Sequence, residues 1–229
     1  MSIQVFIGFD PKETVAAYVL AHSINRHASE PVSITFLALS QLNSVYWRGR
    51  HPLQSTDFSF SRFLVPRLCS YEGRAIFMDC DMLCRSDIAE LWHKTDNDGY
   101  AVHVVKHDYV PKTETKFLGN KQSLYQKKNW SSLMVFNNSQ CHDLDSICVN
   151  SASGLHLHQF LWLDCDEQIR EINPEWNHLV GEYAYNPDAK LVHYTLGTPC
   201  FKEFQDCEYS DEWFNELNLM CRADQKSDY

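Results

Sequence analysis

Two aspartates that directly follow an apolar segment are the residues of this sequence best suited to chemistry. Asp79 and Asp81 come after residues 75–78, Ala-Ile-Phe-Met, and apolar Met82 and Leu83 follow them. Carboxylates held in such surroundings are costly to desolvate unless a cation or hydrogen-bond donors compensate them. Hard oxygen ligands at the end of a strand suit Mg²⁺ or Mn²⁺ carrying a diphosphate. The alternative interpretation is a pair of solvated aspartates at a strand end.

The spacing alone would mean little, because the sequence contains three further Asp-x-Asp triplets. Asp96 and Asp98 precede Gly99 and indicate a turn, and Asp143 and Asp145 lie in a polar stretch. Asp164 and Asp166 form the third. The triplet at residues 79–81 follows a strand-like apolar run and is followed by further apolar residues, and this context makes it the candidate metal site.

His193 is the candidate third ligand, in the segment Leu-Val-His-Tyr-Thr-Leu-Gly at residues 191–197. A single histidine on an apolar strand is commonly a core residue. Gly197, four residues later, favours a functional interpretation because glycine lets backbone amides approach phosphate oxygens. An imidazole ligand suits Mn²⁺ better than Mg²⁺.

Alternating strands and helices are predicted to position these residues. Apolar runs and periodicity predict strands at residues 3–9, 32–39, 74–82 and 100–105, and helices at 13–26, 61–69 and 88–94. Strand-like segments follow at 130–136 and 191–195, and a helix at 211–222. This order predicts an α/β fold with a mainly parallel sheet and helices on both faces. Ligands bind beyond the carboxyl ends of the strands in such sheets.

The domain organisation is predicted to be simple. Residues 1–222 form one domain, and residues 223–229 a polar C-terminal tail. The lysine-rich segment at 107–128 is either a flap that orders over a ligand and excludes water, or a solvated basic loop.

Composition limits the partners and the compartment. The formal net charge of −10 argues against a sequence-independent grip on nucleic acid. No apolar run approaches the roughly 20 residues that span a bilayer, and the N-terminus reads as a first strand. The nine cysteines are scattered and odd in number, so we expect reduced thiols and a cytoplasmic protein.

Five blocks, taken in order, resemble the GT-A nucleotide-sugar glycosyltransferases, most closely the glycogenin-like and bacterial lipopolysaccharide galactosyltransferase-like branch. The resemblance covers residues 3 to about 201. The blocks lie at residues 6–10 (FIGFD), 60–63 (FSRF), 75–81 (AIFMDCD), 129–137 (NWSSLMVFN) and 191–197 (LVHYTLG).

The resemblance implies a role for each matched residue. Asp79 would bridge ribose and metal, while Asp81 and His193 would complete the metal site. The remaining implied donor contacts are Phe9 and Asp10 at the base and ribose, Arg62 near the Asp-x-Asp loop, Ser131 and Ser132 beside the sugar, and Gly197 at the diphosphate. Asp166 and Glu167 resemble the acidic segment that touches the sugar hydroxyls.

One departure concerns the cation that faces the diphosphate. Glycogenin-like enzymes place glycine three residues after the metal histidine and follow it with Lys-Pro-Trp. Here Gly197 lies four residues after His193, and the residue directly before Pro199 is threonine, not lysine. Lys202 is the candidate replacement, with Lys106 and Lys112 of the flap region as alternatives.

The resemblance therefore predicts a metal-dependent glycosyltransferase that moves a sugar from a nucleotide-diphosphate donor, UDP first, to an acceptor hydroxyl with retention. The acceptor would be a glycan, a lipid-linked sugar or a small molecule. Asp166 or Glu167 would serve as a general base if the reaction inverted. The alternatives are a non-catalytic nucleotide-sugar binding module and a phosphohydrolase of the haloacid-dehalogenase type, which also uses Asp-x-Asp after an apolar strand.

Overall fold

The structure is a computed structural model of the chain, and it describes residues 2–50, 54–96, 99–108, 115–116, 120–121 and 126–222. The predicted tail at 223–229 lies outside these residues, and so does much of the predicted flap. Within the flap, strands β6 (Thr115–Lys116) and β7 (Asn120–Lys121) pair antiparallel.

A six-stranded mixed sheet forms the centre of the molecule, in the spatial order β2-β1-β3-β8-β5-β9. β1 is parallel to β2 and β3, and β5 is parallel to β9, whereas β8 runs antiparallel between β3 and β5. Its strands are β1 (Ile3–Gly8), β2 (Val32–Leu37), β3 (Arg74–Met78), β5 (Val102–Val104), β8 (Leu133–Asn137) and β9 (Ile169–Glu171). The predicted α/β fold with a mainly parallel central sheet is confirmed, and the antiparallel course of β8 is a feature that the sequence pattern does not predict.

A second, three-stranded sheet lies beside the first. It contains β10 (His178–Leu179), β11 (Leu191–His193) and β4 (Met82–Cys84), in that order. β4 is antiparallel to β11. The single strand predicted at 74–82 is therefore wrong: β3 and β4 belong to different sheets, and residues 79–81 connect them.

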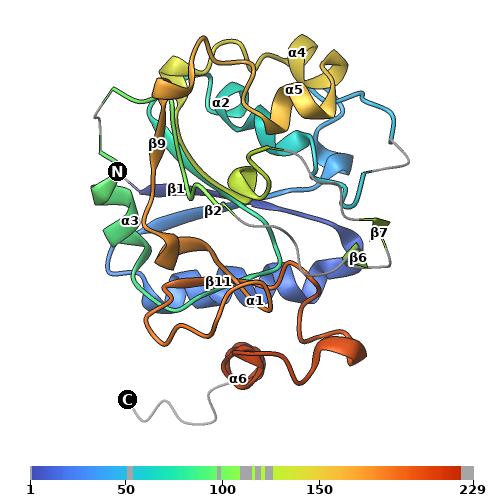
Figure 1. The fold of residues 1–229 in the computed structure, drawn as a ribbon, viewed down its shortest axis with the longest axis vertical. Coiled ribbons are helices and arrows are strands. Elements are labelled where there is room, and N and C mark those ends of the chain that lie inside the picture. Colours follow the sequence, from blue (N-terminus) through green and yellow to red (C-terminus); the bar gives the residue numbers. More distant parts are fainter. Residues whose placement is uncertain are drawn as a thin grey trace.

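Helices cover both faces of the central sheet, as predicted (Figure 1). α1 and α6 lie on one side with the small sheet, and α2, α4 and α5 on the other. The helices are α1 (Thr14–His27), α2 (Val65–Leu68), α3 (Ile88–Lys94), α4 (Ser146–Ser151), α5 (Gly154–His158) and α6 (Ser210–Cys221). Among the described residues, none of these helices combines the length and apolar character needed to cross a bilayer.

The predicted helix at 61–69 is only partly regular. Ser61–Leu64 forms a 3₁₀ turn, and α2 begins after it with Pro66 in its first turn. Proline is tolerated there because its missing N–H would have no partner inside the helix. This compact turn fixes Arg62 against the central sheet.

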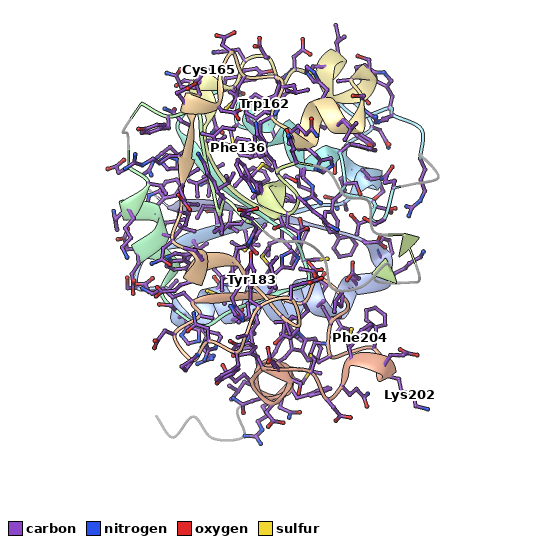
Figure 2. The ribbon with its side chains drawn as sticks, viewed as in Figure 1. Phe136, Trp162, Cys165, Tyr183, Lys202 and Phe204 are labelled. Carbon is purple, nitrogen blue, oxygen red and sulfur yellow. The ribbon has the colours of Figure 1, made fainter. Side chains whose placement is uncertain are left out.

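Apolar burial explains why the strand segments are continuous hydrophobic runs. β1, β3 and β8 are buried almost throughout, because helices or the second sheet cover both faces. Phe136 and Trp162 belong to the main core (Figure 2), and a second cluster around Tyr194 and Trp213 joins the small sheet to α6.

Candidate active site

The site is built where the chain passes from the central sheet to the small sheet. The amide of Asp79 donates to the carbonyl of Ser132, 2.9 Å away, which extends the pairing of β3 with β8. The carbonyl of Asp81 accepts from the amide of Tyr194 at 2.8 Å, which extends the pairing of β4 with β11. The two aspartates are thus anchored in different sheets, one on each side of Cys80.

His193, at the end of β11, completes a cluster with these aspartates. One ligand atom from each of Asp79, Asp81 and His193 lies within 4.8 Å of the other two. The imidazole is 3% exposed and the Asp81 carboxylate 18%, so the cluster opens to solvent on the carboxylate side. Sequence pattern and resemblance pointed to these three residues, and the structure brings them together.

The donor set fits a divalent cation. His193 Nε2 lies 3.2 Å from Asp81 Oδ1, yet this buried oxygen has no hydrogen-bond donor among the described residues. His193 Nδ1 faces the side-chain oxygen of Asn177 at 3.0 Å, which places the ring hydrogen on Nδ1. An imidazole lone pair and a carboxylate oxygen therefore face each other, an arrangement that a cation would stabilise.

Arg62 holds the second carboxylate. Its Nη1 lies 2.8 Å from Asp79 Oδ1 and donates to the carbonyl of Ser131 at 2.9 Å. The guanidinium lies 5.3 Å from the ring centre of Phe58 and 5.1 Å from that of Phe77. Arg62 is therefore fixed in the core as the counter-charge of Asp79.

Ser131 and Ser132, which the resemblance places beside the donor sugar, form hydrogen bonds with residues around the site. Both are buried. Ser131 Oγ is 2.8 Å from His158 Nδ1. Ser132 Oγ accepts from the Asn177 amide nitrogen at 2.8 Å and donates to the carbonyl of Asn129 at 2.7 Å. Their contacts with a donor sugar remain a prediction.

The first predicted block lies at the carboxyl end of β1. Phe9 is half-buried against Phe36, with ring centres 5.9 Å apart. Asp10 is buried, and its carboxylate accepts from the backbone amides of Lys12 and Asp57 at 3.0 and 3.1 Å. Asp10 therefore organises its own turn and a neighbouring loop. Its predicted contact with base and ribose remains a prediction.

Glu13 is a functional candidate that the sequence analysis missed. Its side chain is buried, and burial raises its pKa to about 9, with further contributions from the carboxylates of Asp81, Asp10 and Asp79. The thiol of Cys80 donates to its Oε2 at 3.7 Å. A neutral Glu13 thus lies beneath the Asp-x-Asp segment, although the sequence shows only a helix start.

His107 is a buried histidine near His193. Burial lowers its pKa to about 3, and the nearby His193 and His178 add to the effect. Its Nδ1 lies 2.9 Å from the hydroxyl of Tyr183, a residue seen near the middle of the molecule in Figure 2. A neutral His107 adds no positive charge beside the metal-ligand candidates.

Gly197 and Lys202, the two predicted diphosphate contacts, lie in different surroundings. Gly197 has φ +152°, and a Cβ there would lie 2.3 Å from the Phe204 ring. Its amide already donates to the carbonyl of Tyr194 at 2.9 Å. Packing against Phe204 thus accounts for the glycine. Lys202 is exposed and points outward at the rim of the molecule (Figure 2), so both predicted diphosphate contacts remain predictions.

The predicted acidic pair lies in an open cleft along β9. Asp166 and Glu167 are exposed there, and Lys106 and Arg170 line the same cleft of about 750 Å³. Lys127, from the end of the flap region, pairs with Asp166. The contacts of Asp166 and Glu167 with sugar hydroxyls, and their role as a general base, remain predictions.

Comparison with known proteins places the chain in a family. The model of glycosyl transferase family 8 matches residues 21–198. The chain is 43% identical to Protein CDI of Arabidopsis thaliana over 232 residues, covering 97% of this chain and 89% of that protein.

Solved structures share the fold at low identity. The galactosyltransferase LgtC, in complex with donor and acceptor sugar analogs, superimposes with a TM-score of 0.56 at 11% identity, covering 97% of this chain and 98% of LgtC. The bifunctional glycosyltransferase WbbM gives a TM-score of 0.60 at 17% identity, covering 94% of this chain. This chain spans only 49% of the length of WbbM.

The family match covers most of the chain, including Asp79, Asp81 and His193, and it leaves no place for the phosphohydrolase alternative. The chain belongs to glycosyl transferase family 8 and is a glycosyltransferase of the GT-A fold.

Proposed function

We propose that this glycosyltransferase transfers a sugar from a nucleotide-diphosphate donor, with UDP as the first choice, to an acceptor hydroxyl, in a reaction that requires Mn²⁺ or Mg²⁺. The observation that carries the proposal is the buried Asp81 Oδ1, which has no hydrogen-bond donor among the described residues and faces His193 Nε2 at 3.2 Å. Asp79, Asp81 and His193 would hold the cation. When bound, the cation would neutralise charge that develops on the leaving diphosphate.

The protein's own groups would prepare the donor site. Arg62 would hold Asp79 in place as its counter-charge, because the guanidinium is itself fixed by three acceptors in the core, the Asp79 carboxylate and the carbonyls of Ser131 and Phe58. Neutral Glu13 and neutral His107 keep further charge away from the cluster. The site would therefore be arranged before the donor binds, which lowers the reorganisation needed during the reaction.

The acceptor would enter from the cleft along β9. Its lining mixes acids, bases and Tyr100, which suits the hydroxyl groups of a glycan, a lipid-linked sugar or a small molecule. Asp166 and Glu167 would contact sugar hydroxyls there. We propose retention of anomeric configuration, on the resemblance to lipopolysaccharide galactosyltransferases, and a cytoplasmic location, which the nine free thiols support.

Thermal unfolding with UDP, GDP, CDP and ADP, each with and without Mn²⁺, tests the donor and the metal together. A ligand that binds the native state raises the melting temperature. We expect a manganese-dependent rise with one diphosphate, lost in Asp81→Ala. Asp143→Ala is the matched control, since it removes an exposed aspartate from another Asp-x-Asp triplet.

The same set of measurements can contradict the proposal. If no diphosphate shifts the melting temperature with either metal, the proposed donor site is wrong. If a diphosphate binds but no sugar transfer is detected with any acceptor class, the result favours a non-catalytic nucleotide-sugar binding module over a transferase. The anomeric configuration of a product, read by proton NMR, decides between retention and inversion.

A further inference from the structure

Asn177 occupies a position behind His193 that neither sequence pattern nor resemblance indicated. It ends the 3₁₀ turn Pro174–Asn177, which follows β9, and its side chain is fully buried. It is adjacent in sequence to buried Trp176 and His178, and neither neighbour suggests a role for it.

The Asn177 amide has a defined orientation. Its oxygen accepts from His193 Nδ1 at 3.0 Å, and its nitrogen donates to Ser132 Oγ at 2.8 Å. Ser132 Oγ donates its single hydrogen to the carbonyl of Asn129 at 2.7 Å, so it can only accept from Asn177. Asn129 has φ +62°, a left-handed conformation that asparagine tolerates better than most residues.

This chain of hydrogen bonds sets the tautomer of His193. With the hydrogen held on Nδ1, the lone pair of Nε2 points toward the Asp81 carboxylate. The reverse amide orientation would put a donor against Nδ1 and shift the hydrogen to Nε2, where it would block metal binding. The contrast with His107, whose Nδ1 faces the Tyr183 hydroxyl instead, shows that an amide partner is not a general feature of the buried histidines here.

We propose that Asn177 is a positioning residue for the metal site: it holds His193 in the tautomer whose Nε2 is free to bind the cation. The inference rests on the proposed function, because it assumes that Asp79, Asp81 and His193 bind a divalent metal. Hydrogen-bond partners behind metal-binding histidines typically change metal affinity 10- to 100-fold when removed.

The test compares Mn²⁺ binding, followed by electron paramagnetic resonance, in wild type, Asn177→Leu and Asn177→Asp. Leucine removes the acceptor, and we expect the Kd for Mn²⁺ to rise about 10- to 100-fold. Aspartate keeps an acceptor for Nδ1–H, and Ser132 can turn its hydrogen toward the new carboxylate. We therefore expect Asn177→Asp to bind Mn²⁺ at least as tightly as wild type.

A second readout follows the tautomer without any metal. In protein labelled with ¹⁵N-histidine, His193 is assigned by comparison with His193→Gln. We expect the Nδ1–H form in wild type and in Asn177→Asp, and a gain of the Nε2–H form in Asn177→Leu. A purely structural role for Asn177 would not move this signal.

Asn138→Leu is the matched control, because Asn138 is an equally buried asparagine that donates to the carbonyl of Glu72, at the opposite end of β8 from Ser132. It should lower the melting temperature without changing the Kd for Mn²⁺. Equal Mn²⁺ affinity in wild type and Asn177→Leu would overturn the inference, and so would equal weakening in the leucine and aspartate variants. Absence of Mn²⁺ binding in wild type would instead contradict the proposed function.

Discussion

Arg62 and Asp79 form a nearly buried ion pair, with Nη1 2.8 Å from Oδ1 and side chains 7% and 14% exposed. Breaking a buried pair by removing one partner leaves the other charge uncompensated, which costs about 3–5 kcal/mol. We therefore expect Arg62→Met to lower the free energy of unfolding by roughly this amount when metal is removed with EDTA, as measured by urea denaturation.

The same variant should respond more strongly to metal than wild type does, because a bound cation would replace the lost counter-charge of Asp79. Arg62→Lys keeps one charge but cannot serve three acceptors, so its loss should be smaller. An Arg62→Met protein as stable as wild type in EDTA would show that the pair contributes little.

The pH dependence of stability should contain a contribution from Glu13, whose pKa is raised to about 9 by burial and by the carboxylates of Asp81, Asp10 and Asp79. Between its ordinary pKa and 9, the folded protein binds a proton that the unfolded chain does not. The free energy of unfolding must then fall as pH rises, by up to about 1.4 kcal/mol per pH unit.

Glu13→Gln keeps the shape and removes the titration. Denaturation at pH 5.5, 7.0 and 8.5 should show the wild type losing stability relative to this variant as pH rises. Glu203→Gln, at an exposed position, is the control and should leave the slope unchanged. Parallel pH profiles for wild type and Glu13→Gln would mean that Glu13 is already ionised in the folded protein.

Gly197→Ala should destabilise the protein through a steric clash, because the added Cβ would lie 2.3 Å from the Phe204 ring. Overpacking costs about 1–3 kcal/mol, and φ +152° adds backbone strain for any other residue. The double variant with Phe204→Ala should be less destabilised than the sum of the two single variants. If the losses of stability of the two single variants simply add up in the double variant, the clash with Phe204 does not explain why residue 197 is glycine.

The contact between α1 and α6 should be sensitive to acid through Glu216. Burial alone would raise its pKa, but hydrogen bonds and charge from Arg26 and His22 leave the pKa below its ordinary value. Its stabilising effect is therefore present above pH about 4.5 and disappears as pH falls through the lower folded value.

We expect Glu216→Gln to cost about 1–3 kcal/mol at pH 7, between surface and buried ion pairs because Arg26 is 43% exposed. The difference from wild type should shrink in urea melts below pH 4.5. An undiminished difference at low pH would assign the effect to packing, not to charge.

Local pattern was sufficient for much of the fold and for the position of the aspartates. The apolar run before Asp79 indicated a buried strand, and the order of strands and helices indicated the α/β class. The same run led to the prediction of one strand at residues 74–82, where the structure has two, β3 and β4. Apart from the two aspartates, the residues on either side of the change of sheet are apolar and buried, as Cys80, Met82 and Leu83 show, so the pattern does not mark where β3 ends.

Non-local contacts account for what the sequence analysis missed. The antiparallel course of β8 depends on its insertion between β3 and β5, which no local periodicity records. β10 has only two residues, too few for a pattern. Asn177 is defined by side chains 16 and 45 positions away in the chain, so only the folded arrangement could show its role.

Residues 79–81 cross from the central sheet to the small sheet, so the distance between the two aspartates depends on how the sheets are oriented relative to each other. Because Asp79 is tied to β8 and Asp81 to β11, a small rotation between the sheets changes the spacing of the carboxylates at once. Substitutions at Tyr194 or Trp213, which pack the small sheet against α6, should thus alter metal affinity while the fold is still intact. The affinity for metal would then measure how firmly packing against α6 fixes the orientation of the small sheet relative to the central sheet.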